Sequence, residues 1–220
     1  MPPSNRIPKP TARRLSRYLR LLQVREAGGG GASVSSRELA EAAGVVDAQV
    51  RKDLASVGAV GQPGVGFRSA DLLERLRSAM GLERSWRVAL VGAGKIGRAL
   101  LAYPRFTEEG FEIVAVFDRS PAVVGRKLAG HVVQSMSALP EGVKRSGAEL
   151  GIVAVPPDEA QDVAQALVRA GIGGVLNFAP RPLRLAPAVP VVPVDFTEAL
   201  ERLAFEITAR RGATGRSRGG

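Results

Sequence analysis

The chain has 220 residues, of which 45% are hydrophobic, and it carries a net charge of +10. These values suit one or two domains with packed cores and exclude a wholly disordered chain. The absence of cysteine excludes disulfides, thiolate metal sites and a cysteine nucleophile, and no apolar run reaches the ~20 residues that a membrane helix needs.

The N-terminal segment MPPSNRIPKPTARR is charged, but no apolar segment follows it as in a signal peptide. Together with the missing cysteines, this favours a cytoplasmic protein that has no membrane partner and holds no metal.

The positive charge lies at the two ends of the chain. Residues 1–84 carry 14 Lys and Arg against 8 Asp and Glu, residues 85–207 carry 13 of each, and residues 208–220 add four arginines. This asymmetry favours double-stranded DNA as a partner of the N-terminal part. A generally basic surface of solvated arginines is the alternative, and charge alone does not decide between the two.

Apolar spacing predicts three helices at the start of the chain. The first covers residues 11–27 and ends at the GGGG segment. Ser35 and Glu38 have the spacing of a capping box, so a second helix begins there, and Gly44 ends it. The third helix covers residues 47–57 and completes a helix-turn-helix, whose second helix enters the major groove in DNA-binding proteins.

The third helix has one apolar face and one polar face. Val50, Leu54 and Val57 share the core side, which leaves the polar side chains between them for bases and phosphates. Four glycines and a proline in residues 58–67 predict a β-hairpin wing, and a further helix covers residues 70–80. The DNA-binding candidates are Arg14, Ser36, Gln49, Arg51, Lys52, Ser56 and Gly64. The same helical pattern also occurs in three-helix domains that do not bind DNA.

From residue 86 onward, strands alternate with helices. Apolar strands between helices predict a parallel sheet covered on both faces, and therefore an α/β fold. The predicted strands are 86–91, 112–117, 150–155, 175–178 and 191–194, and the predicted helices are 95–103 and 158–170.

The segment GAGKIG matches G-x-G-x-x-G between a predicted strand and a predicted helix, which is the context of a dinucleotide-binding turn. Gly92 makes the tight turn, Gly94 admits the pyrophosphate, and Gly97 lets the helix pack on the strand. Asp118 ends the next strand, where it would accept hydrogen bonds from the adenine ribose and favour NAD(H). Arg119 weakens this preference, because an arginine there can accommodate a 2′-phosphate. A turn that has lost its ligand is the alternative.

A dehydrogenase would also need a proton donor or acceptor beside its substrate. His131 is the only histidine. We expect it in a connection at the sheet edge, where a lone histidine is more often a surface or packing residue. Residues 85–207 are nearly all used by the nucleotide-binding fold, so no substrate domain remains. We therefore predict no catalytic residue and a cofactor that serves as a signal.

Several segments together resemble the Rex family of bacterial redox-sensing transcriptional repressors. The resemblance runs from about residue 7 to residue 208, and the order and spacing of VRKDL, the glycine turn and LNFAP make it specific. The matching segments are IPKPTARRLSRYLRLL, VSSRELAEAAGV, VRKDL, GQPGVGF, VALVGAGKIGRALLAYPRF, VAVFDRSPAVVGRKLAG, VAVPPDEAQDVAQALVRAGIGGVLNFAP and PVDFTEAL.

The resemblance implies a homodimeric repressor that binds palindromic operators of respiratory and fermentative genes and that NADH releases from DNA. NADH and NAD⁺ are then sensed ligands. The cofactor-binding residues that it implies are Gly92, Ala93, Gly94, Lys95, Ile96, Gly97, Asp118, Val155, Pro156, Asn177, Phe178 and Phe196, with Ala179 near the nicotinamide. It also implies a polar network of Arg20, Tyr103 and Asp195 that links cofactor, winged helix and partner subunit.

The predicted organisation is a winged helix-turn-helix domain (1–84), a Rossmann-type domain (85–195), a C-terminal domain-swapped helix (196–211) and a disordered basic tail (212–220). Two features depart from the family: the GGGG loop, and Ala55-Ser56-Val57 in place of an aromatic pair before Gly58. The competing function is an NAD-dependent oxidoreductase with an appended helical domain, and a nucleotide-binding module that does not touch DNA is a third alternative.

Overall fold

The computed structural model describes residues 7–216 along the backbone, and their side chains as far as residue 209. The chain divides into two compact units, residues 1–84 and residues 85–220. No helix in the described part is both long enough and apolar enough to cross a membrane.

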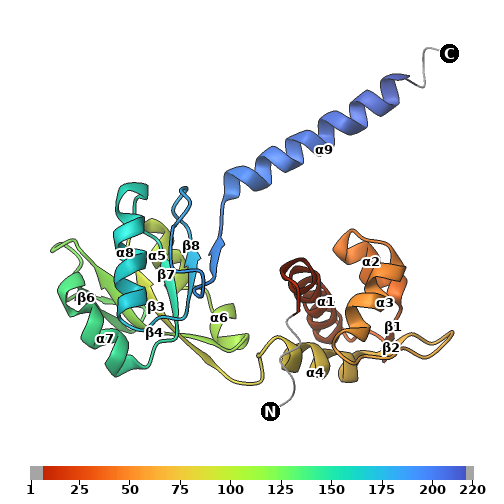
Figure 1. Ribbon diagram of the computed structural model, residues 1–220, viewed down its shortest axis with the longest axis horizontal. Helices are drawn as coiled ribbons and strands as arrows, with labels where there is room; N and C mark the ends of the chain where they lie inside the picture. Colours follow the sequence, from red (N-terminus) through yellow and green to blue (C-terminus); the bar gives the residue numbers. More distant parts are fainter. Residues whose placement is uncertain (1–6, 217–220) are drawn as a thin grey trace. The chain divides into compact units, whose positions relative to one another are not determined.

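The N-terminal unit is a winged helix-turn-helix (Figure 1). Its core is formed mainly by apolar side chains from all four helices. The elements are α1 (Lys9–Ala27), β1 (Ser33–Val34), α2 (Ser36–Ala43), α3 (Asp47–Ala55), β2 (Phe67–Arg68) and α4 (Ser69–Ala79).

The predicted helix boundary at Ser35 is confirmed. The Ser35 side chain accepts a hydrogen bond from the Glu38 backbone N–H, and the Glu38 carboxylate accepts one from the Ser35 backbone N–H. These two bonds satisfy donors that the first turn of a helix leaves unpaired. Gly44 ends α2 in a left-handed conformation, with φ 68°, and α3 follows after a short turn.

The predicted hairpin after α3 is also present. Gln62 and Gly66 form an antiparallel bridge around a three-residue loop. The returning chain enters β2, which pairs antiparallel with β1. The hairpin is therefore anchored by a two-stranded sheet rather than by the helices alone.

The C-terminal unit is a seven-stranded sheet in the order β5-β6-β4-β3-β7-β8-β9. All neighbours pair in parallel except β5, which is antiparallel to β6. The elements are β3 (Trp86–Val91), α5 (Lys95–Leu101), α6 (Arg105–Glu108), β4 (Phe111–Asp118), β5 (Lys127–Leu128), β6 (His131–Ser135), the 3-10 helix η1 (Met136–Ala138), α7 (Leu139–Ser146), β7 (Leu150–Val153), α8 (Pro157–Arg169), β8 (Gly174–Asn177), β9 (Val191–Pro193) and α9 (Phe196–Arg216).

The six parallel strands have the order of a dinucleotide-binding sheet, in which the first strand lies next to the fourth. Here the first strand is β3 and the fourth is β7. The order reverses between them, so their carboxyl ends border the crevice in which such sheets hold ligands.

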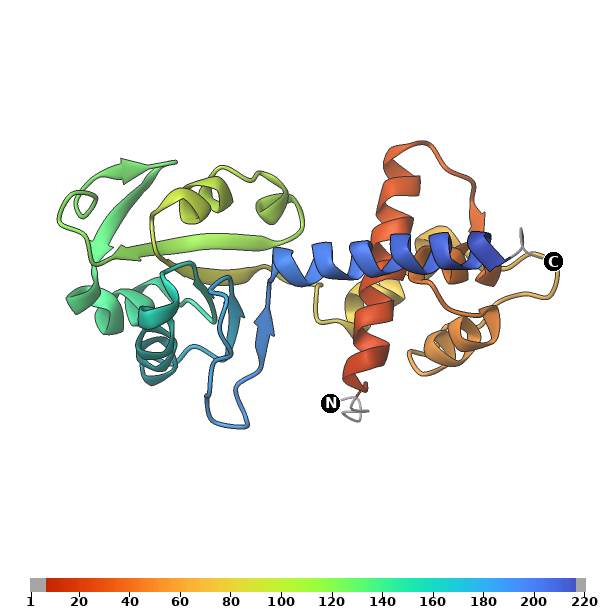
Figure 2. The same cartoon turned by 90° about the horizontal axis from the view of Figure 1, so that it is seen from above.

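Helices cover the two faces of the sheet unequally (Figure 2). On one face, α7 and α8 pack on Val91 and Phe117 in a large core. On the other face, α5 and α6 cover β3 and β4. An apolar groove of about 380 Å³ remains on that second face, lined by residues of α6, β3, β4, β7, β8 and β9.

Several segments differ from the sequence-based expectation. His131 does not lie in a connection but begins β6, which the periodicity did not predict, and β5 and α7 were not predicted either. The predicted strand 150–155 ends at Val153, before the turn that carries Val155 and Pro156. Helix α9 continues to Arg216, so the tail predicted to be disordered from residue 212 is helical as far as 216, and residues 217–220 lie outside the described residues.

Candidate functional site

The recognition helix α3 is fixed to α1 by a buried carboxylate. Asp53 is 2% exposed and accepts four hydrogen bonds. Arg14 donates two, from Nε at 2.5 Å and from Nη2 at 2.7 Å, while the Tyr18 hydroxyl and the Gln49 amide donate at 3.0 and 2.9 Å. Since α1 and α3 meet at one carboxylate, the orientation of α3 is fixed by polar geometry as well as by apolar packing.

The pKa values of this cluster follow from its hydrogen bonds. Burial raises the pKa of the Asp53 carboxyl, but the hydrogen bonds from Arg14, Gln49 and Tyr18 outweigh burial, and the net pKa lies below its usual range. Burial and the hydrogen bond to Asp53 raise the pKa of Tyr18 above its usual range. The cluster therefore holds a charged Asp53 and a neutral Tyr18 at neutral pH.

The structure separates the DNA-binding candidates into two groups. Arg14 and Gln49 are bound to Asp53, which gives Arg14 a structural role that its basic sequence context did not suggest. Arg51 and Lys52 are exposed on the outer side of α3, and Arg51 also contacts Asp47 and Ser36, at 2.7 and 3.4 Å. The basic surface of α3 is therefore Arg51 and Lys52.

Two further candidates lie after α3, one directly at its end and one in the hairpin. Ser56 follows the last residue of α3, and its hydroxyl donates to the Asp53 carbonyl at 2.5 Å. Gly64 lies at the exposed tip of the hairpin with φ 76°, where a side chain would meet nothing within 4 Å. Glycine is favoured there by its conformational freedom.

In the C-terminal unit, the glycine turn borders a pocket at the point where the strand order reverses. The turn follows β3, and the residues after β4 and β7 complete the wall. The lining residues are Val91, Gly92, Gly94, Asp118, Arg119, Ser120, Met136, Ala154, Val155, Pro156, Glu159 and Val163.

Two glycines of the turn are required by space. A Cβ on Gly97 would lie 1.8 Å from the Gly92 oxygen, and a Cβ on Gly92 would lie 2.3 Å from the Ala154 oxygen. Gly94 differs, because nothing lies within 4 Å of the position of its Cβ. The fold itself therefore needs the first and third glycines, and the second keeps open the space in which a pyrophosphate is expected.

Asp118 is held by backbone donors. One carboxylate oxygen accepts from the Ala93 N–H and the other from the Ser120 N–H, both at 2.7 Å. Ala93 therefore positions Asp118 at the pocket through its N–H, which is engaged in that bond. Lys95 and Ile96 begin α5 with exposed side chains.

The segment NFAP lies at the end of β8, and its residues are not among those that line the glycine-turn pocket. The buried Asn177 amide donates to the backbone oxygens of Ala179 and Arg181 and accepts from the Ala179 N–H. Both ends of this amide are engaged within the loop, so Asn177 shapes the loop, and its contact with the nicotinamide stays a prediction. Phe178 faces Phe196 of the same chain, with ring centroids 6.5 Å apart.

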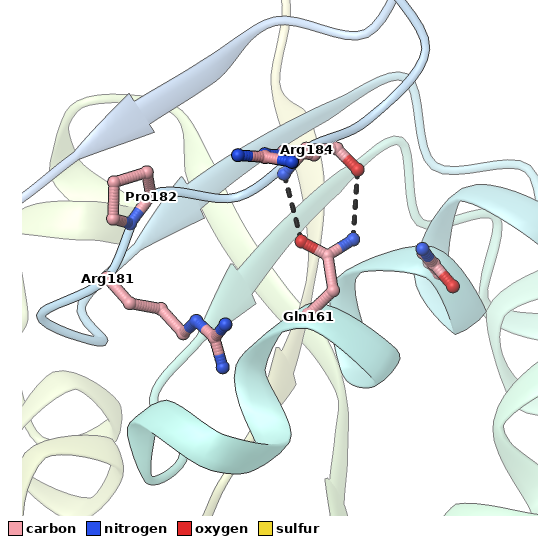
Figure 3. A pocket seen from close by; sticks show the side chains of 5 residues that line it. Gln161, Arg181, Pro182 and Arg184 are labelled. Carbon is pink, nitrogen blue, oxygen red and sulfur yellow. Dashed lines mark hydrogen bonds between the residues drawn. The ribbon is translucent and has the colours of Figure 1, made fainter.

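A larger open cavity, of about 670 Å³, lies against α8 outside the glycine turn (Figure 3). Figure 3 shows Gln161 between α8 and the loop that follows NFAP: its amide donates to the Arg184 oxygen and accepts from the Arg184 N–H, both at 2.9 Å. Arg181 donates to the Pro157 oxygen. These contacts fix the loop and assign the cavity no ligand.

The three residues of the implied polar network lie in different units. Arg20 is an exposed residue of α1, whereas Tyr103 and Asp195 belong to the C-terminal unit. Tyr103 packs edge-on against Phe106, and Asp195 accepts from the Thr197 and Glu198 N–H groups at the start of α9. The network itself stays a prediction.

Sequence reasoning missed two site residues, Asp53 and Glu159. Asp53 lies within VRKDL, but its partners Arg14 and Tyr18 are 39 and 35 residues away. Glu159 is in the first turn of α8 and pairs with Arg119 in the pocket. A buried acidic residue in a helix shows no local pattern that distinguishes it from a surface one, so neither could be found without the fold.

Comparison with known proteins covers both units. A family model described as "CoA binding domain" matches residues 83–181, and one described as "Putative DNA-binding protein N-terminus" matches residues 6–55. The redox-sensing transcriptional repressor Rex of Carboxydothermus hydrogenoformans is 45% identical over 92% of this chain and 97% of its own length. The redox-sensing transcriptional repressor Rex 1 of Thermotoga maritima is 39% identical over 94% of this chain and 99% of its own.

Solved structures agree over almost the whole chain. The crystal structure of RSP in complex with β-NADH matches with a TM-score of 0.85 at 29% identity, covering 96% of this chain and 99% of that one. RSP in complex with β-NAD⁺ and operator DNA matches with a TM-score of 0.83 at 30% identity, covering 97% and 98%. The chain therefore belongs to the Rex family of redox-sensing transcriptional repressors, and it is a regulator rather than an enzyme.

Proposed function

We propose that this protein is a DNA-binding repressor that senses the NADH/NAD⁺ ratio and acts in the cytoplasm, where its DNA lies. One observation carries the proposal: a single chain combines a helix-turn-helix bonded together through Asp53, with Arg51 and Lys52 exposed, and a glycine-turn pocket lined by Asp118. The RSP structures, with β-NADH and with β-NAD⁺ and operator DNA, support both ligands.

DNA binding rests on α3. Arginine and lysine bind phosphates and base edges in the major groove, and the Asp53 cluster holds α3 in one orientation while they do so. The target is a palindromic operator, since two-fold related recognition helices read two equivalent half-sites.

NADH binding rests on the glycine turn. The pyrophosphate lies beside Gly94, where space is open, and the adenine ribose lies at Asp118. The NADH nicotinamide ring is neutral and that of NAD⁺ is cationic, so the apolar side chains of Phe178 and Phe196, which the family resemblance assigns to the nicotinamide, would favour NADH. A coupling of about 1–3 kcal/mol between the two sites changes operator affinity about 5–150-fold.

The working form is a homodimer that exchanges α9. Every described side chain of α9 from Phe196 to residue 209 is exposed. Phe196, Leu200, Leu203 and Ile207 recur at helical spacing and form an apolar stripe on it. An apolar stripe on one element and an apolar groove on the sheet are the surfaces that a second copy buries.

The test is fluorescence anisotropy of a labelled duplex from the gene's own promoter, titrated with protein at fixed salt. We expect binding that NADH abolishes and excess NAD⁺ restores. Binding indifferent to both nucleotides would overturn the sensing part, and no binding to any promoter region would overturn the DNA part. NADH-dependent reduction of a carbonyl substrate would favour the oxidoreductase instead.

A double variant identifies the DNA-binding surface. Replacing Arg51 and Lys52 by alanine weakens operator binding and leaves NADH binding intact, because both side chains are exposed on α3 and lie in the other unit from the glycine turn. The matched control replaces Lys144 and Arg145 of α7, which removes the same charge elsewhere. Equal operator affinity of the Arg51–Lys52 variant and the wild type would contradict the assignment.

A further inference from the structure

The cofactor pocket contains an ion pair that neither the glycine turn nor Asp118 requires. Arg119 follows β4, Glu159 lies in the first turn of α8, and the Arg119 Nη2 atom is 3.0 Å from the Glu159 Oε1 atom. Both residues line the pocket together with Asp118. The pair therefore links two walls of the pocket at the end that is expected to hold the adenine ribose.

The two partners differ in burial. The Glu159 side chain is 18% exposed and that of Arg119 is 69% exposed. Among the described residues, the buried Glu159 Oε1 atom has no partner with hydrogen-bond geometry, so Arg119 neutralises it by charge rather than by an aligned bond. The carboxylate is thus the fixed member of the pair, and the guanidinium is the member that can move.

The pairing of Arg119 with Glu159 affects which dinucleotide fits at the expected ribose position. A 2′-phosphate carries up to two negative charges, and arginine is the side chain that binds such a group in bidentate geometry. Arg119 would supply that partner if it were free. While it is paired, a 2′-phosphate meets two carboxylates, Asp118 and Glu159, and none of the other residues that line the pocket is a cation. A ribose that carries only hydroxyls meets an acceptor at Asp118 and no repulsion.

We propose that Glu159 determines specificity in this pocket: by holding Arg119, it excludes dinucleotides that carry a 2′-phosphate, so that the pocket accepts NADH and rejects NADPH. This inference rests on the proposed function. It assigns the discrimination between NADH and NADPH to the Arg119–Glu159 pair rather than to Asp118 alone. An unpaired Arg119 would favour NADPH, whereas Arg119 paired with Glu159 contributes to its rejection.

The test compares NADPH and NADH binding to the full-length protein by isothermal titration calorimetry. Glu159→Gln keeps the shape of the side chain and removes the charge that holds Arg119. We expect the ratio of the NADPH to the NADH dissociation constant to fall by about tenfold or more. Adding Arg119→Ala to Glu159→Gln returns the ratio toward the wild-type value, because the phosphate loses its new partner.

Asp158→Asn is the matched control, since Asp158 is the exposed neighbour of Glu159 and does not line the pocket. If Asp158→Asn changed the ratio of the two dissociation constants equally, the effect would come from the loss of any negative charge near the pocket, and the inference would be overturned. An unchanged ratio in Glu159→Gln would overturn it too. So would a gain in NADPH binding that persists in the double variant with Arg119→Ala. A wild-type protein that does not bind NADH would overturn the proposed function first and this inference with it.

Discussion

The junction of α1 and α3 depends on one side chain, that of Asp53. Its carboxylate receives hydrogen bonds from two residues of α1 and one of α3. Removing one partner of a buried ion pair leaves the other desolvated and uncompensated. Arg14, whose side chain is 20% exposed, would then be a half-buried cation without its carboxylate at the junction of the two helices.

We predict that Asp53→Asn destabilises the N-terminal unit by about 3 kcal/mol near neutral pH. The folded-state pKa of Asp53 is lowered, so its contribution is complete above the unfolded pKa of ~3.9 and is lost as the pH falls through the folded value. Urea unfolding followed by circular dichroism should therefore show a difference between variant and wild type that shrinks below about pH 4.

Two controls accompany this measurement. Asp47→Asn removes an exposed carboxylate of the same helix, paired only with Arg51 among the described contacts, and should change stability little. Trp86, the only tryptophan, lies in β3 and reports on the other unit. If the free energy of unfolding differed between Asp53→Asn and the wild type by the same amount at every pH, the role of the charged Asp53 carboxylate would be contradicted.

Asp53 also marks the limit of sequence reasoning at this scale. The capping residues Ser35 and Glu38 were predictable, because both partners lie within one helical turn. The glycine spacing and Asp118 were predictable, because a strand, a turn and a helix flank them in order. The Asp53 cluster and the Arg119–Glu159 pair join residues that only the tertiary fold brings together.

The glycine turn is the element in which folding and binding can be separated. Gly97 touches the Gly92 oxygen, so an added methyl group strains the fold itself. Gly94 has open space around it, so a methyl group there strains nothing in the chain. The two positions thus form a matched pair within four residues.

We expect Gly97→Ala to destabilise the C-terminal unit by about 3 kcal/mol, because a close-packed backbone contact must open. Gly94→Ala should unfold like the wild type and bind NADH about tenfold or more weakly, since its methyl group occupies the approach of the pyrophosphate. Urea unfolding monitored by Trp86 fluorescence and a calorimetric NADH titration separate the two effects. Normal NADH binding by Gly94→Ala would place the pyrophosphate elsewhere.

At this scale, the alternation of strands and helices was predictable and several boundaries were not. Long apolar strands such as β3 and β4 are predicted by their composition. β5 has two residues and β6 carries polar residues between its apolar ones, so neither shows a clear period. The C-terminal helix was predicted to end at residue 211, before the segment rich in glycine and arginine. The helix α9 instead continues to Arg216.

For the whole molecule, the exposed α9 is the feature that needs a partner. Apart from the ring contact between Phe196 and Phe178, its stripe of four apolar side chains is exposed, and large exposed apolar surface on a monomer favours association. The neutral charge of residues 85–207 imposes no repulsion between two copies of this part.

We predict that Leu203→Glu converts the dimer to a monomer, because a charge in the middle of the stripe would be buried unpaired. Sedimentation equilibrium should give twice the chain mass of 23.1 kDa for the wild type and the single mass for the variant. Glu201→Gln on the same helix is the control and should remain dimeric. A dimeric Leu203→Glu protein would move the interface away from α9.

The edge of the sheet at β9 has a consequence for how copies can meet. The Pro190 oxygen and the Val194 N–H point toward β8, so Val191 and Pro193 direct their backbone groups outward. Pro193 has no N–H, which leaves one outward donor along the strand. At the opposite edge, β5 has only two residues. Neither margin offers a full ladder for another strand, so this sheet is a poor template for strand-by-strand aggregation, while the exposed apolar stripe of α9 remains available for association.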